Sequence, residues 1–326
     1  MTAKLNNYDF VFRLLTLILV ACSLAGVAAP FHWFFDLFDH FRLHYLLGFL
    51  ILSLILVSRR QMAYASIAIV GVTFNIRSVI HIYQPVQPPA INVVNEGPTV
   101  KLLQWNMLAG NHQFDQGMSF LIEQDPDIIA LQELTHPWLP HLGALESKYP
   151  FRKMIPTSDP MGIALLSKFP MENTRVLYME ENNELPFIES KIMIENQPIK
   201  ILNIHAKPAI GNDFALSRLQ QFKGIKSWHK SQEIPAVITG DFNATPWSQA
   251  MKTITSDSNM VHASQGLGFQ WTWPANLWLP FLNIPIDHTL YNKQRFKVVH
   301  RQMGPNLGSD HKPIVTTLQL ILPQST

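Results

Sequence analysis

An apolar run in the second half of the chain leads into an Asp and an Asn that could do chemistry. Residues 234–243 read Ile-Pro-Ala-Val-Ile-Thr-Gly-Asp-Phe-Asn, which predicts a buried strand with Asp241 and Asn243 at its C-terminal end. Side chains two positions apart on an extended chain point the same way, so we expect the carboxylate and the amide to face one site. The carboxylate could orient or deprotonate a water, and the amide could hold a phosphate oxygen or an attacking hydroxide. Because Gly, Asp and Asn are also common turn residues, this stretch alone fits a polar turn equally well.

Other predicted strand ends carry polar residues that an apolar strand does not need. Each has an ordinary explanation when taken alone: Glu133 as a surface residue, His205 as a hydrogen-bonded core histidine, and Asp310 as a turn cap. Six such motifs in one region, all at strand ends, instead indicate a common site. The six are Trp105-Asn106, Gln132-Glu133, Asn203-Ile204-His205, Asp241-Phe242-Asn243, Ile286-Asp287-His288 and Ser309-Asp310-His311.

Strands and helices that could position these motifs alternate along the second part of the chain. Many strands with few helices, in mixed order, predict an α/β fold of two packed sheets with helices outside. No internal repeat is visible. Strands are expected at 100–105, 127–131, 161–166, 187–194, 199–205, 234–238, 286–291 and 313–322, and helices at 113–124 and 214–230.

The first eighty or so positions hold an excess of apolar residues. The whole chain of 326 residues is 47% hydrophobic and only 15% charged. Apolar runs at 11–29, 43–57 and 62–82 predict about three transmembrane helices, since a cleavable signal peptide is not normally followed by two more such runs. A signal peptide and buried core helices remain alternatives, because residues 27–29 resemble a cleavage site, the second run is short, and Asn75 interrupts the third.

Positive charges predict the orientation of these helices. Lys4 and Arg13 lie beside the first run, and Arg59-Arg60 separates the second run from the third. Cytoplasmic loops keep the excess of Lys and Arg, so these residues are expected inside and everything after the third run outside. The expected location is therefore the inner (plasma) membrane, multi-pass, with a periplasmic catalytic domain. If the third run does not span, the large domain is cytoplasmic instead.

A proline-rich stretch separates the two parts of the chain. Residues 85–98 contain Pro-Val-Gln-Pro-Pro-Ala and Asn-Glu-Gly-Pro, which predict an extended linker. The expected division is a membrane region at 1–84, a linker at 85–99 and a catalytic domain at 100–326. Residues 101–326 hold 19 Lys and Arg against 19 Asp and Glu, and this neutrality does not favour nucleic acid as a partner. Cys22 is the only cysteine, which excludes disulfides and cysteine-based metal sites within one chain.

The six motifs, in this order, resemble those of the endonuclease/exonuclease/phosphatase superfamily. That superfamily includes DNase I-like nucleases, abasic-site endonucleases, inositol polyphosphate phosphatases and neutral sphingomyelinases. The resemblance covers residues 100–322 and implies a four-layer α/β sandwich with its site at the edge shared by the two sheets. The three N-terminal runs further resemble the membrane-bound teicoplanin-resistance-type proteins of this superfamily, which are linked to undecaprenyl phosphates.

This resemblance implies a metal set and a catalytic set. Glu133 would be the principal ligand of Mg²⁺ or Mn²⁺, with Asn106 beside it and Asp310 as a second metal or orienting carboxylate. Met107 follows Asn106 where some members carry another polar residue, which favours a single metal. The implied catalytic residues are His205, Asp241, Asn243, Asp287 and His311.

Each catalytic residue would have its own task. Asp241 would orient or activate the attacking water, and Asn243 would hold the phosphate or the nucleophile. His311 would contact the scissile phosphate, while Asp287 would orient its imidazole and raise its pKa. His205 would lie against the phosphate.

One apolar stretch bears on the substrate. Residues 269–284 contain Trp271, Trp273 and Trp278, and they either pack in the core or form a lip that faces the bilayer. The expected function is a membrane-anchored, divalent-metal-dependent phosphoesterase, with a lipid phosphate or diphosphate as one candidate substrate. The alternatives are a Mg²⁺-dependent nuclease acting on DNA and an inactive membrane-anchored binding module, and the intact residue set argues against the second.

Overall fold

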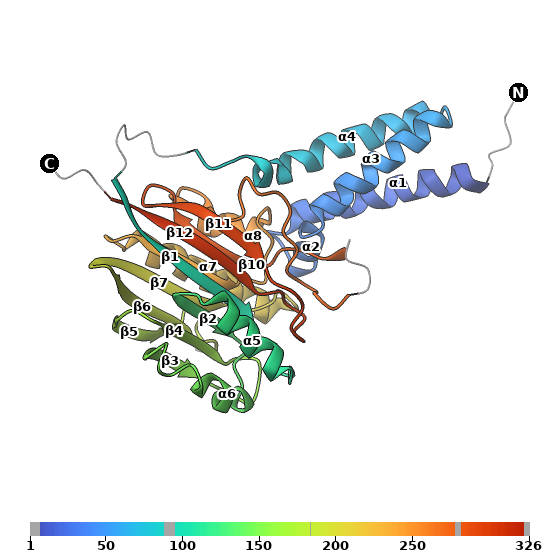
Figure 1. The fold of residues 1–326 in the computed structure, drawn as a ribbon. Coiled ribbons are helices and arrows are strands. Elements are labelled where there is room, and N and C mark those ends of the chain that lie inside the picture. Colours follow the sequence, from blue (N-terminus) through green and yellow to red (C-terminus); the bar gives the residue numbers. More distant parts are fainter. Residues whose placement is uncertain (1–6, 88–94, 183, 278–281, 323–326) are drawn as a thin grey trace, which may run out of the picture.

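Two six-stranded sheets pack face to face in the computed structural model, and three long helices extend from one end of this sandwich (Figure 1). The structure describes residues 7–87, 95–182, 184–277 and 282–322.

The first sheet has the strand order β11-β12-β1-β2-β4-β3. Strands β1 and β2 run parallel, whereas the other neighbouring pairs are antiparallel. Helices α5 and α6 cover its outer face. The bounds are β1 Asn95–Asn106, α5 Phe114–Gln124, β2 Ile128–Gln132, α6 Leu139–Gly143, β3 Phe151–Ile155, β4 Ile163–Ser167, β11 Phe296–Met303 and β12 Ile314–Leu322.

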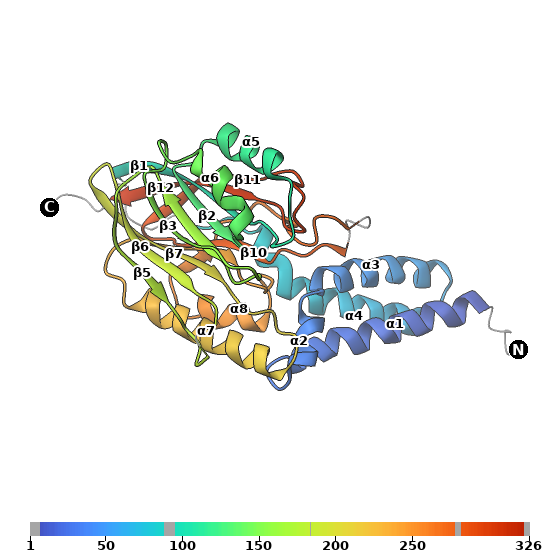
Figure 2. The same cartoon turned by 90° about the horizontal axis from the view of Figure 1, so that it is seen from below.

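The second sheet has the order β5-β6-β7-β8-β10-β9 and repeats the design of the first. Strands β7 and β8 form its parallel pair, and helices α7 and α8 cover its outer face, as seen from below in Figure 2. The bounds are β5 Met171–Leu177, β6 Phe187–Ile194, β7 Gln197–His205, α7 Asn212–Lys230, β8 Ala236–Asp241, α8 Gln249–Thr255, β9 Met260–His262 and β10 Asp287–Asn292.

Alternating side chains divide the core into layers. In β1, Leu102 packs between the two sheets, whereas Leu103 packs under α5 and α6. The alternation follows from the two-residue period of a strand, and it turns Gln104 and Asn106 toward the other sheet as well. Helices on both outer faces complete four layers, which confirms the α/β sandwich expected from the sequence.

Strand direction brings the polar strand ends to one edge. The parallel strands β1, β2, β7 and β8 all finish there, and the antiparallel strands β10 and β12 start there. Asp287 is paired in register with Asp241, and Ile314 with Gln104. Motifs at the ends of four strands and at the starts of two others therefore meet, although almost the whole domain separates them in the chain.

The first strand begins earlier than expected. β1 starts at Asn95 and pairs with β12, so it includes the last residues of the predicted linker. Pro98 is tolerated because the register shifts between Glu96 and Thr99, where a missing N–H breaks no ladder bond. Part of the linker, residues 88–94, lies outside the described ranges.

Three long helices precede the sandwich and lie side by side in both views (Figures 1 and 2). Within the described residues, two helical segments are long and apolar enough to cross a membrane, Asn7–Ala28 and Met62–Tyr83. The short helix α2 and helix α3, with 7 and 17 residues, pass the same test only together, and a 56° bend separates them. The individual helices are α1 Asn7–Ala25, α2 Trp33–Asp39, α3 Arg42–Ser58 and α4 Met62–Val79.

Asn75, which interrupts the third apolar run, is accommodated inside this bundle. Its side chain is fully buried and donates to Ser23 Oγ at 2.9 Å and to the main-chain oxygen of Gly71 at 2.9 Å. A polar side chain satisfied between helices is compatible with a span.

Candidate active site

A layer of amides lies beneath the polar strand ends. Gln104 Nε2 donates to Gln132 Oε1 at 2.8 Å and to Asp287 Oδ1 at 3.0 Å. Gln132 in turn donates to Asn203 Oδ1 across the two sheets at 2.6 Å. All four side chains are buried, so the network joins the sheets through hydrogen bonds and fixes the position of Asp287, while Gln104 Oε1 has no donor among the described residues.

Asn106 lies between two carboxylates. Its Nδ2 donates to Glu133 Oε1 and to Asp241 Oδ2, both at 3.0 Å. Its Oδ1 accepts from the backbone of Leu108, so the amide presents nitrogen to the site. Glu133 has a left-handed φ of 57°, and its second oxygen accepts from the Ala109 backbone at 2.9 Å. The chain therefore turns sharply after β2 and directs Glu133 over the end of β1.

Asp241 lies at the centre of the site. Its Oδ2 is 3.6 Å from His205 Nε2 and 3.7 Å from His311 Nε2, in addition to its bond from Asn106. Burial is the largest effect on this carboxyl, and with the nearby Asp287 it raises the pKa to about 6, although the two histidines oppose the rise.

Gly240 lets the catalytic strand pass close to its neighbour. Its φ is +142°, and a Cβ there would lie 1.9 Å from the carbonyl oxygen of Ile204 in β7. Only glycine permits this approach, which sets Asp241 directly beside His205.

Asn243 reaches the same site by a different route from the one expected. The strand ends at Asp241, and Asn243 takes a left-handed φ of 48°. Its backbone N–H donates to Asp241 Oδ1 at 2.8 Å, which closes a tight turn. Its side-chain nitrogen then lies 3.5 Å from Asp241 Oδ2 and donates to the Ala206 carbonyl at 2.9 Å. The two side chains converge because the backbone turns, not because it stays extended.

His311 and Asp287 form a buried ion pair. Their Nδ1 and Oδ2 atoms are 2.9 Å apart, and both side chains are almost completely buried. Burial alone would lower the pKa of His311, but the carboxylates of Asp287 and Asp241 outweigh it and raise the pKa to about 10. Burial would likewise raise the pKa of Asp287, but His311 and hydrogen bonds from its neighbours hold it below its usual value. The imidazole is therefore protonated at neutral pH, with Nε2 directed at the site.

Asp310 lies at the more open side of the site. Its Oδ2 accepts from Trp273 Nε1 at 2.9 Å, and its Oδ1 has no hydrogen bond from any described residue. His311 Nε2 lies 4.0 Å from that oxygen. A buried carboxylate oxygen without a hydrogen bond is a ready acceptor for a cation or a water.

The charges in the site call for a cation. Four carboxylates converge here, and even two protonated histidines would leave an excess of negative charge in a largely buried space. Carboxylate oxygens with few nitrogen ligands suit hard divalent cations. The side chains of Glu133 and Asp310 are 12% and 26% exposed, so they are the carboxylates of this site that a cation from solvent reaches most easily.

A second grouping, Asp241, Asp287 and His311, also has the compactness of a metal site. Ligand atoms of these three residues lie within 4.8 Å of one another. His311 uses Nδ1 to bind Asp287, so only Nε2 of this imidazole is directed at the site.

All eight residues singled out in the sequence lie in this one cluster, although their individual roles stay predictions. The sequence reasoning missed Gln104 and Thr272. Thr272 Oγ1 accepts from the backbone N–H of Asp287 at 3.2 Å, but nothing distinguishes it from any polar residue in an apolar loop. Gln104 is the second polar residue on the inner face of β1, and this break in an apolar strand face could have identified it.

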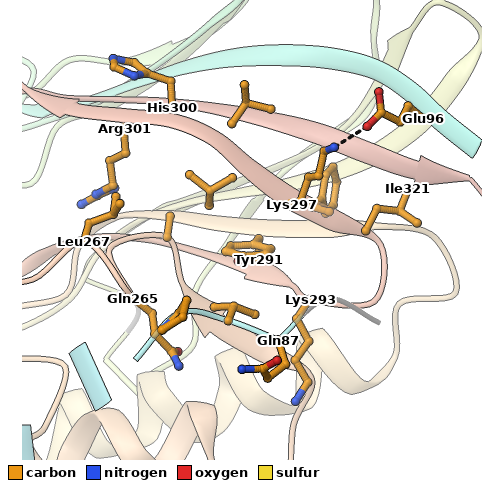
Figure 3. A pocket seen from close by; sticks show the side chains of 16 residues that line it. Gln87, Glu96, Gln265, Leu267, Tyr291, Lys293, Lys297, His300, Arg301 and Ile321 are labelled. Carbon is orange, nitrogen blue, oxygen red and sulfur yellow. Dashed lines mark hydrogen bonds and ion pairs between the residues drawn. The ribbon is translucent and has the colours of Figure 1, made fainter. Parts of the chain in front are cut away.

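A cavity of about 490 Å³ lies elsewhere, between residues 85–87 and strands β10 and β11 (Figure 3). Tyr291 lies in its middle, and Lys297 at one side pairs with Glu96. None of the eight site residues lines it.

The chain belongs to the endonuclease/exonuclease/phosphatase family, because the model of that family matches residues 103–311, more than half of the chain. Among solved structures, an endonuclease/exonuclease/phosphatase from Bacteroides vulgatus is similar at 21% identity and a TM-score of 0.58, covering 69% of this chain and 100% of that one. No curated protein sequence gave a significant match.

Two enzymes from animals share the fold as well. The human Nocturnin catalytic domain with bound sulfate is 19% identical with a TM-score of 0.57, covering 72% of this chain and 100% of that one. TDP2 from D. rerio, complexed with a single-strand DNA product, is 14% identical with a TM-score of 0.57, covering 68% and 99%. The family defines a metal-dependent phosphoric ester hydrolase, as the sequence predicts.

Proposed function

We propose that the protein hydrolyses a phosphate ester by means of an activated water, with Mg²⁺ or Mn²⁺ as its metal. One observation carries the proposal: contacts of 4 Å or less connect Glu133, Asn106, Asp241, His311 and Asp287 without a break. The cluster therefore supplies carboxylates, an amide and an imidazolium in a single space. Displacement at phosphorus needs a positioned water, neutralisation of the phosphate charge and a proton for the leaving oxygen.

Each need has a candidate residue. Asp241 accepts the proton of the water or orients it, and Asn243 is held beside Asp241 to bind the same water or a phosphate oxygen. The imidazolium of His311 stabilises the negative charge that develops on the phosphate, and its Nε2 carries the proton that the leaving oxygen takes up. Glu133 and Asp310 would hold the metal ion, which, when bound, supplies Lewis-acid stabilisation of the phosphate oxygens.

The proposed substrate is a phosphate or diphosphate carried by a membrane lipid. Leu277 and Leu282, which flank the undescribed residues 278–281, are 37% and 39% exposed, and they follow Trp273, the partner of Asp310. This stretch contacts the helix bundle, where the rings of Trp271 and His44 are 6.5 Å apart. An apolar stretch that adjoins both the site and the helices suits a substrate with a hydrocarbon tail.

A substrate comparison tests this proposal. The full chain in detergent should release phosphate from a long-chain polyprenyl diphosphate in mixed micelles with a kcat/KM at least about 100-fold above that for a short-chain analogue, because binding of the tail contributes to the reaction. A plasmid-nicking assay with Mg²⁺ runs beside it, and Asp241→Asn serves as the control in both. The wild-type chain could instead nick the plasmid and leave the lipid unchanged, with nicking lost in Asp241→Asn. That result would show that the protein is a nuclease and would contradict the proposed lipid substrate.

We also propose that the three helices span the inner membrane with the catalytic domain outside. Arg59 pairs with Asp9 at the end of the bundle remote from the catalytic domain, and Arg60 follows it in the same turn. Helix α2 packs against the catalytic domain at the opposite end. Positive charge at the far end supports an inside N-terminus.

A reporter fusion tests the orientation. An alkaline phosphatase fused after the last residue should be active, because this enzyme needs the oxidising periplasm to form its disulfides. An inactive fusion, together with an active cytoplasmic reporter at the same position, would contradict the proposed topology.

A further inference from the structure

A segment between the first two apolar helices holds the loop that follows the catalytic strand. This β8–α8 loop, residues 242–248, contains Asn243 and leads into α8. Trp247 Nε1 donates to the main-chain oxygen of Asp39 at 3.0 Å. The backbone N–H of Gln249 donates to Asp39 Oδ2 at 2.7 Å, and His40 Nδ1 lies 3.2 Å from Thr245 Oγ1.

Arg218 of α7 completes this connection and reaches the active site itself. Its Nη1 donates to the main-chain oxygen of Asn243 at 2.8 Å, and its Nη2 binds the carboxylate of Asp36 in α2. Arg218 and Asp36 are only 4% and 5% exposed, so solvent screens this ion pair little. One guanidinium therefore links the N-terminal region to a residue that contacts Asp241.

The peptide that Arg218 holds is in an uncommon conformation. Asn243 has a left-handed φ of 48°, a region that few non-glycine residues enter and that asparagine enters more readily than most. Its N–H binds Asp241 and its carbonyl binds Arg218, so both of its main-chain polar groups are held. Loss of the Arg218 bond would release the carbonyl and let the Asn243 side chain leave Asp241.

We propose that Arg218 is a positioning residue for hydrolysis, and that Asp36 holds it in place. The inference rests on the proposed function, since Asn243 matters only if the site acts on a phosphate. On this basis residues 36–40, which belong to the membrane-proximal part of the chain, are a structural component of the active site.

Kinetics of full-length variants in detergent test this proposal. With bis(4-nitrophenyl) phosphate as substrate, Arg218→Gln should lower kcat by roughly 30- to 100-fold and leave KM within about threefold, because a small displacement of a catalytic group costs rate and not ground-state binding. Asp36→Asn should lower kcat by about tenfold, since Arg218 keeps Asn243 but loses its ionic anchor. Arg218→Lys should recover only part of the rate, because an ammonium lacks the fork that spans both acceptors.

A matched control and a second readout make the result decisive. Arg175→Gln removes another arginine–carboxylate pair, with Glu189 in β6, and should leave kcat unchanged. Hydrogen exchange of the full chain should show faster exchange in residues 242–248 of Asp36→Asn and Arg218→Gln but not of Arg175→Gln.

Wild-type kcat in Asp36→Asn and Arg218→Gln, or an equal loss in all three, would overturn the proposal. If Arg218→Gln does not fold, Asp36→Asn decides, because this substitution leaves the bond from Arg218 to Asn243 in place. Asp36 also contacts His40, and Asp36→Asn weakens that contact as well.

The two proposals fail in different ways. A wild-type chain that hydrolyses neither this ester nor the lipid would refute the proposed function, and the exchange pattern would then still decide whether Arg218 and Asp36 hold the loop. Unchanged exchange in both variants would refute the positioning role, even if the wild-type enzyme is active.

Discussion

Asp241→Asn should lower kcat by about 10³-fold and leave the fold intact. The substitution keeps the shape of the side chain but removes the charge that faces His205, His311 and Asn106. An amide cannot accept the proton of the attacking water, and it holds the imidazolium less firmly. The measurement is the steady-state rate on bis(4-nitrophenyl) phosphate at saturating Mg²⁺, with the melting temperature of the same preparations.

The melting temperature of Asp241→Asn distinguishes a loss of catalysis from damage to the core. Because burial raises the pKa of Asp241 to about 6, the folded state binds more protons than the unfolded state between the ordinary pKa and about 6. Stability is therefore lost as the pH rises through that window, and at pH 7 to 8 the ionised carboxylate is a cost that Asn removes. In EDTA, the variant should melt at or above the wild-type temperature. Asp115→Asn, at an exposed position in α5, should change neither quantity, and an Asp241→Asn variant with wild-type kcat would contradict the role of this carboxylate.

Asp287→Asn should lower kcat by roughly 100-fold at neutral pH and shift the alkaline limb of the rate profile to lower pH. Asp287 accepts from His311 Nδ1 and supplies the largest of the carboxylate effects that raise the imidazole pKa to about 10. The charged imidazolium form of His311 exists below the pKa of this residue and is lost above it. The wild-type imidazolium therefore survives to about pH 10, whereas the variant should lose it well below that pH.

The pH dependence of kcat between pH 6 and 10 measures this shift. The wild-type rate should show no fall from His311 between pH 7 and 9, while the Asp287→Asn rate should decline across that range. His311→Ala, which has no imidazole to titrate, should be slow at every pH and lack the decline. An Asp287→Asn profile that is parallel to the wild-type profile would show that Asp287 does not control the charge of His311.

The catalytic cluster was predictable from sequence for a physical reason. An apolar strand that ends in Asp, Asn, His or Glu has no packing need for those residues, and six such ends in one region indicate a common site although each alone has an ordinary explanation. Strand direction then brings these polar residues together, because the ends of parallel strands and the starts of antiparallel ones share an edge of the sheet. The central strands β1, β7 and β8 were recognisable because most of their residues before these polar ends are apolar and buried.

Other parts were not predictable from local pattern. Strands β3 and β5 lie at sheet edges, and their residues are mostly half-buried or exposed, so they lack an apolar signature. The pairing of Asp36 with Arg218 joins positions 182 residues apart, and in sequence Asp36 is just an acidic residue in a loop between apolar runs. The turn at Asn243 depends on its contacts with Asp241 and Arg218, and no rule of strand alternation anticipates it.

The most direct test of the proposed metal-dependent hydrolysis is a Mg²⁺ titration of the full-length enzyme after treatment with EDTA. The rate on bis(4-nitrophenyl) phosphate should fall to background without metal, recover saturably with Mg²⁺ or Mn²⁺, and stay near background at every metal concentration in Asp241→Asn. A rate that EDTA does not change, or that the wild-type and Asp241→Asn enzymes share, would contradict a metal-assisted hydrolysis at this site.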